Sequence, residues 1–110
     1  MQTVTTPLPL PVEKALLRLG QQLSLARRRR HLSQEDLAER IGASVNTVRR
    51  LEDGYPGIAI QTFARALQVF GELDKLTKFM DTPEDTVGLV LMDSSVPQRV
   101  RRRKRESGAL

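Results

Sequence analysis

The stretch LSQEDLAERIGASVNTVRRLEDG, residues 32–54, contains two short helical patterns separated by a glycine. The first begins at Ser33, where a hydroxyl is followed three residues later by the carboxylate of Asp36, a spacing typical of a capped helix start. It predicts a helix over 34–41. The apolar spacing places three of its side chains in the core, namely Leu37, Ala38 and Ile41.

Gly42 ends this first pattern, because glycine adopts without strain the left-handed conformation that often follows a helix. Ser44, two residues later, is again a favourable N-cap. A second helix is therefore predicted over 45–52, with Val48 and Leu51 inward and polar side chains outward. A helix, a turn of about three residues and a second short helix form the pattern of a helix-turn-helix.

Residue by residue, this stretch resembles the Xre/Cro/cI family of helix-turn-helix proteins. The matching positions are Leu32, Ser33, Gln34, Leu37, Ala38, Ile41, Gly42, Ser44, Val48, Leu51, Glu52 and Gly54. The resemblance covers roughly residues 19–71, since IAIQTFARALQVFG, residues 58–71, is similar to the family's fourth helix. It implies an all-α, five-helix domain that binds double-stranded DNA and is not an enzyme.

The flanking segments predict three further helices. Apolar residues spaced by three and four indicate a helix from Glu13 to Arg30 or His31, another over 60–70, and a fifth that continues to Met80. Their predicted inward side chains are Leu16, Leu19, Leu23, Ala26, Ile60, Phe63, Ala66, Leu67, Phe70, Leu73, Leu76, Phe79 and Met80. Residues 83–92 fit either a helix, with Pro83 in its first turn, or a short strand.

These patterns divide the chain into four parts. Residues 1–12 contain Pro7, Pro9 and Pro11 and are expected to form a flexible, extended arm. Residues 13–80 form the DNA-binding domain. Residues 81–98 are a C-terminal extension expected to contact a second copy or another partner, and residues 99–110 form a basic tail expected to be disordered.

Composition restricts the functions open to the chain. A core built from part of 110 residues is marginal alone, which favours a homodimer. The chain has no cysteine, and His31 is its only histidine, so we expect no disulfide, metal site or cofactor. No apolar run is long enough to span a membrane and no signal peptide is evident. A cytoplasmic, nucleoid-associated protein is expected.

The net charge of +5 is unevenly distributed. Residues 14–50 contain nine basic and three acidic side chains, whereas residues 51–98 contain three basic and eight acidic ones. The net positive charge of the whole chain comes from six cations in the tail, namely Arg99, Arg101, Arg102, Arg103, Lys104 and Arg105. Because basic side chains outnumber acidic ones in residues 14–50, this part of the chain is suited to face an anion such as DNA.

The resemblance implies that the second helix of the motif enters the DNA. Val45, Asn46 and Arg50 occupy positions similar to the family's base-reading residues, and Arg49 lies nearby. Arginine can bind guanine through two hydrogen bonds, asparagine can bind adenine, and valine can contact the thymine methyl group. The alternative is that Asn46, Arg49 and Arg50 are solvated polar positions.

Other residues are assigned to the phosphate backbone or to the scaffold. Ser33, Gln34, Thr47, Arg28 and Arg30 are candidate phosphate contacts; Arg28 and Arg30 are alternatively solvated. The resemblance implies that Arg27 forms a structural ion pair with Glu52. His31 replaces a glycine common in the family and must adopt or avoid a left-handed conformation.

The segment 96–103, Val-Pro-Gln-Arg-Val-Arg-Arg-Arg, is similar to that of HipB-like antitoxins, which pair with HipA-type kinase toxins. Three functions remain open: an antitoxin that represses its own operon on a pseudo-palindromic operator, a stand-alone repressor, and an adaptor that uses the fold as scaffold. The tail has three corresponding roles: binding DNA phosphates, keeping the protein soluble, or docking on a toxin.

Overall fold

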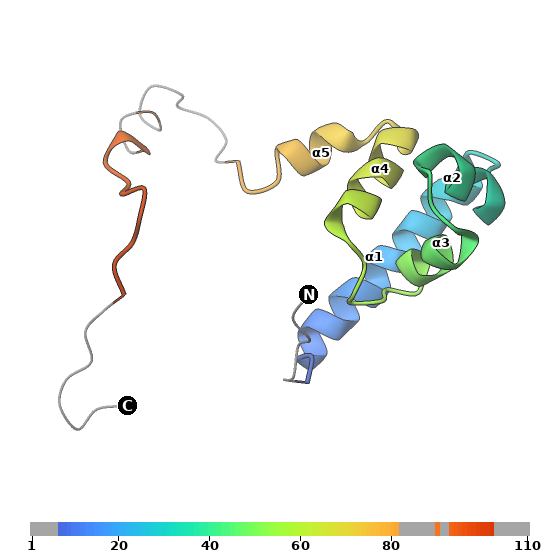
Figure 1. Ribbon diagram of the computed structural model, residues 1–110, viewed down its shortest axis with the longest axis horizontal. Helices are drawn as coiled ribbons and strands as arrows, with labels where there is room; N and C mark the ends of the chain where they lie inside the picture. The colour runs from blue at the N-terminus through green and yellow to red at the C-terminus, as the bar shows by residue number, and fades with distance from the viewer. Residues whose placement is uncertain (1–6, 82–89, 91–92, 103–110) are drawn as a thin grey trace. The chain divides into compact units, whose positions relative to one another are not determined.

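The structure is a computed structural model that describes residues 7–81, 90 and 93–102. Its helices are α1 (Leu10–Arg29), α2 (Gln34–Ile41), α3 (Val45–Glu52), α4 (Ile60–Phe70) and α5 (Leu73–Thr77), shown in Figure 1. The described residues contain no strand, and the prediction of an all-α, Cro/cI-type fold is confirmed. The choice between helix and strand at 83–92 falls almost entirely outside the described residues.

The turn between α2 and α3 has the local signals that the sequence predicts. Ser33 Oγ accepts the Asp36 backbone N–H at 3.0 Å, and the Asp36 carboxylate accepts the Ser33 N–H at 2.9 Å. The hydrogen bond from the Ser33 backbone N–H, followed by one from its side chain, lowers the pKa of the Asp36 carboxyl. Gly42 has φ 68°, and Ser44 Oγ accepts the Thr47 N–H at 3.1 Å. Both helices therefore begin at a serine cap, and a left-handed glycine ends the first.

The core joins α2, α3 and α4 to the second half of α1. Its buried apolar side chains are Leu23, Leu37, Ala38, Ile41, Val48, Leu51, Ala66 and Phe70. The buried residues of α1 all lie at or beyond Gly20, and its first half runs on past the other helices (Figure 1). The backbone of Leu16 also lies close to Gly54, so the domain holds α1 from Leu16 onward.

Gly20 marks the closest approach of α1 to the end of α3. A Cβ atom at this position would clash with the Glu52 carbonyl oxygen and lie 2.8 Å from both Glu52 C and Gly54 N. Because these neighbours are backbone atoms, they cannot rotate away. The absence of a side chain at Gly20 lets α1 lie directly against the end of α3.

Three boundary predictions differ from the structure. The extended arm predicted over 1–12 is wrong for its last residues, because α1 begins at Leu10 and places Pro11 in its first turn, where no N–H partner is needed. At its other end α1 stops at Arg29. His31 follows in a left-handed conformation, with φ 56°. The fifth helix ends at Thr77 rather than continuing to Met80, which has φ 69°.

Four side chains predicted to be buried are exposed. These are Leu19, Ile60, Phe79 and Met80. Leu19 lies beside the stripe of α1 that packs on the core, Ile60 is the first residue of α4, and Phe79 and Met80 follow the end of α5. Helical periodicity predicted that these residues lie on the apolar faces of their helices, but it did not predict which positions on those faces are buried.

Residues from Met80 onward form a second compact unit. In its described part, the Val96 N–H donates to the Asp93 carbonyl at 3.0 Å. Arg99, Arg101 and Arg102 are exposed and belong to no helix. Arg103, Lys104 and Arg105 lie outside the described residues. Within the described part of the chain, no helix is long and apolar enough to cross a bilayer.

Candidate nucleic-acid interface

The outer face of α3 presents three of the predicted base-reading residues to solvent. Asn46, Arg49 and Arg50 are exposed and lie three and four positions apart, on one side of the helix. Val45 is half-buried against the core. A cationic, amide-bearing helix face of this kind fits the major groove, where arginine and asparagine can each form two hydrogen bonds to a base edge.

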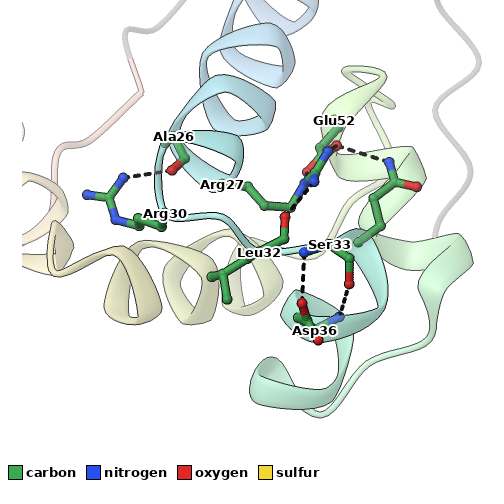
Figure 2. A network of polar contacts seen from close by, with 8 residues as sticks. Ala26, Arg27, Arg30, Leu32, Ser33, Asp36 and Glu52 are labelled. Atoms are coloured by element: carbon green, nitrogen blue, oxygen red, sulfur yellow. Dashed lines mark hydrogen bonds and ion pairs between the residues drawn. The ribbon is translucent and has the colours of Figure 1, made fainter.

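Arg27 and Glu52 fix the position of this helix relative to α1 (Figure 2). Arg27 Nε lies 2.6 Å from Glu52 Oε2, and Arg27 Nη2 lies 3.0 Å from Glu52 Oε1. Their side chains are only 11% and 6% exposed. The hydrogen bonds to Glu52 raise the pKa of Arg27, so the guanidinium keeps its charge. The two residues predicted to pair are thus in direct two-point contact.

The same pair also holds the start of α2. Arg27 Nη1 donates to the Leu32 carbonyl at 2.8 Å, and Gln34 Nε2 donates to Glu52 Oε1 at 3.0 Å. One largely buried network therefore joins the end of α1, the start of α2 and the end of α3. Gln34, predicted as a phosphate contact, has its amide nitrogen engaged within this network.

The predicted phosphate contacts fall into two groups. Arg28 and Gln34 line a single polar hollow, together with Gln21, Ser24 and Asp53. Ser33 and Thr47 are already engaged in caps, since Thr47 Oγ1 lies 3.0 Å from Ser44 Oγ. Of these residues, only Arg28 is exposed and has no hydrogen-bond or ion-pair partner among the described residues, which leaves its guanidinium available to an anion.

Arg30 lies away from this group. Its Nη1 donates to the Ala26 carbonyl and its Nη2 to the Phe70 carbonyl, both at 2.8 Å, and its guanidinium carbon lies 5.0 Å from the Phe70 ring centroid. Arg30 thus satisfies a carbonyl at the end of α4 and stacks on the last residue of that helix. These contacts give it a structural role that the arginine run 27–30 did not predict.

Two further contacts were not predicted. Arg65 of α4 donates from Nη1 to the Ile41 carbonyl at 3.0 Å, which satisfies the end of α2. Tyr55, in the loop after α3, lies with its ring centroid 5.7 Å from the Arg50 guanidinium carbon. Neither pair has a spacing along one helix that would have revealed it. The dense turn signals at 53–57 located the loop but not the direction of the tyrosine ring.

The described residues contain no group of three or more histidine or acidic side chains placed to hold a metal ion. The exposed cationic face of α3, the glycine turn before it and the buried network behind it define a helix-turn-helix DNA-binding domain.

Residues 18–78, more than half of the chain, match the family described as a helix-turn-helix domain. The chain belongs to this Xre/Cro-like helix-turn-helix family. No solved structure matches it.

Proposed function

We propose that the chain is a transcriptional repressor that binds a specific double-stranded DNA operator as a homodimer. The observation that carries the proposal is the exposed face of Asn46, Arg49 and Arg50 on a helix held rigidly by the Arg27–Glu52 pair. A helix fixed in this way holds its exposed side chains in one arrangement relative to the rest of the domain. Side chains that read base edges require such a fixed arrangement.

Phosphate contacts are proposed beside this face. Arg28 and Gln34 line one hollow at the start of α2. Ser33 is the N-cap of α2, and Thr47 lies in the first turn of α3. We omit Arg30, because its guanidinium is bound to carbonyl groups of α1 and α4. Contacts of this kind fix the position of the domain on the duplex without reading its sequence.

The dimer is proposed because a single short recognition helix reads only a few base pairs and because the buried core is small. The operator should then contain two inverted half-sites about one helical turn, roughly 10 base pairs, apart. Selection of duplexes from a random library, followed by footprinting, tests both statements. Protection of one unrepeated half-site by a monomer would contradict the dimer.

The same selection tests the reading residues. Arg50→Ala should weaken binding to the selected operator by about 1–3 kcal/mol, because a two-point contact to a base is lost. Random duplex should be affected less. Equal weakening on both duplexes would make Arg50 a phosphate contact. Failure of the wild-type protein to enrich any sequence would overturn the proposal as a whole.

We further propose that the repressor is the antitoxin of a HipA-like kinase. Support comes from segment 96–103 and from its exposed apolar side chains, since Val96 and Val100 lie open to solvent among arginines. Such a segment can bind a partner through both charge and apolar contact. Co-purification with a kinase-like protein encoded beside it, lost on deletion of 96–110, tests this role. Retention of operator binding without any such partner would favour a stand-alone repressor.

A further inference from the structure

Tyr55, in the loop after α3, lies against Arg50 on the exposed face of that helix. Its ring centroid lies 5.7 Å from the guanidinium carbon of Arg50, within the range of a cation–π interaction. Within the described part of the chain, the Arg50 guanidinium forms no hydrogen bond or ion pair. The ring is thus the principal feature that restrains the Arg50 side chain.

The backbone brings Tyr55 to this place. The Tyr55 N–H donates to the Arg50 carbonyl at 2.9 Å, which folds the chain back on the last turn of α3. The Ile58 N–H then donates to the Tyr55 carbonyl at 3.3 Å. Pro56 lies at the second position of that turn, where its fixed φ is favourable. Tyr55 therefore begins a tight turn hydrogen-bonded to α3.

Gly57 holds the ring from within the same turn. A Cβ atom at Gly57 would lie 2.6 Å from Tyr55 Cε2 and 2.9 Å from its Cζ, closer than real side chains approach. The ring therefore packs on the Gly57 backbone while it also faces Arg50. About half of Tyr55 remains exposed, at 51%, so the stack of Gly57, Tyr55 and Arg50 lies at the surface.

We propose that Tyr55 is a specificity-determining positioning residue that holds the Arg50 guanidinium in one orientation before DNA binds. Arginine has a flexible side chain, and ordering it on binding lowers affinity. A guanidinium already held by a ring loses less freedom when it meets a guanine. The inference rests on the proposed function, in which Arg50 reads a base.

The stack is tested first without DNA. Tyr55 is the only tyrosine and the chain contains no tryptophan, so its ring resonances are easily identified by NMR. Arg50→Ala should shift these resonances. Arg49→Ala, which alters the exposed neighbour, should not. Ring signals that are unmoved by Arg50→Ala would overturn the proposal.

The consequence is tested on an operator selected by the full-length wild-type chain. Tyr55→Leu should weaken operator binding about two- to fivefold, the range expected for an exposed cation–π contact, with a smaller change on random duplex. Tyr55→Phe keeps the ring and should retain wild-type affinity. Gly57→Ala keeps the side chains of Tyr55 and Arg50, but its methyl group occupies the present position of the ring. It should therefore weaken operator binding as Tyr55→Leu does, and it replaces that variant if Tyr55→Leu fails to fold.

A double-mutant cycle assigns the effect to Arg50. In the Arg50→Ala background, Tyr55→Leu should cause no further loss. A persistent loss, or a Tyr55→Phe variant as weak as Tyr55→Leu, would show that the tyrosine hydroxyl contacts DNA directly and would overturn the proposal. If Arg50→Ala weakens operator binding but Tyr55→Leu does not, this inference fails alone. If the wild-type chain selects no sequence, the proposed function fails with it.

Discussion

The guanidinium of Arg27 binds both carboxylate oxygens of Glu52, although the two residues lie 25 positions apart and on different helices. Glu52 also accepts from Gln34, so its buried carboxylate is held by α1 and α2 together. The buried positive charge of Arg27 and the buried negative charge of Glu52 compensate each other. Removing one partner is therefore more harmful than removing the pair.

Arg27→Met should lower the free energy of unfolding by about 3–5 kcal/mol, because it leaves the Glu52 carboxylate buried and uncompensated. The double variant Arg27→Met/Glu52→Leu should recover much of this loss. Urea unfolding followed by circular dichroism measures both. Lys78→Met, which removes an exposed ion pair to Asp74, is the control and should differ little from wild type. A loss for Arg27→Met as small as that of the control would contradict the assignment.

Gly20→Ala should destabilise the protein although alanine favours helix formation by about 1 kcal/mol. The added methyl group meets the backbone of Glu52 and Gly54. Separating α1 from the end of α3 should cost about 1–3 kcal/mol, as overpacking typically does. Thermal unfolding measures the change. Gln21→Ala, one residue on and exposed, is the matched control, and a Gly20→Ala variant as stable as that control would refute the close packing.

Asp36 should make stability depend on pH in the acid range. Its folded pKa lies below the ordinary value of 3.8, so the stabilisation is fully present above that value and is lost as pH falls through the lowered pKa. Asp36→Ala should therefore flatten the acid limb of a plot of stability against pH. Ser33→Ala removes the hydroxyl but keeps the backbone N–H that the Asp36 carboxylate accepts, so it should flatten the limb only in part, while Ser24→Ala should leave the limb unchanged. An acid limb of wild-type steepness in Asp36→Ala would exclude the capping carboxylate as its source.

Deletion of residues 99–110 should reduce the salt dependence of DNA binding. Each cation that lies near a phosphate releases counterions, so the loss of six cations should make the slope of log affinity against log salt shallower by several units. Operator and random duplex should weaken alike, because such contacts do not read sequence. An unchanged slope together with a weakened toxin complex would assign the tail to the partner. If neither changed, the tail would serve solubility alone.

Local signals explain what the sequence predicted of the fold. The bounds of α2, α3 and α4 agree with the prediction. The helices α2 and α3 begin at serine caps, and α2 and α4 end at left-handed glycines, which are signals that act through neighbouring residues. Burial at the helix ends was predicted less well. Ile60 continues an apolar period but is the first residue of α4 and is 73% exposed.

The candidate site, like the fold, was predicted only in part. The family resemblance brought Arg27 and Glu52 together, and the structure shows that contact. Arg30 was assigned to phosphate from its charge alone, whereas its partners are carbonyls of Ala26 and Phe70. The stack of Tyr55 on Arg50 depends on how the loop folds back on α3. Such contacts follow from tertiary placement, which helical periodicity does not encode.

The attachment of α1 from Leu16 onward has a consequence for local opening. The first buried residue of this helix is Gly20, and its six residues before Leu16, 10–15, are all exposed. Amide hydrogens there can exchange with solvent through fraying of successive turns, without disruption of the core. We expect amides around Leu37, Val48 and Ala66, whose side chains are almost fully enclosed, to exchange only when the whole domain unfolds. We therefore expect the part of this long helix from Leu16 onward to unfold together with the recognition helix, and its exposed first turns to fray separately.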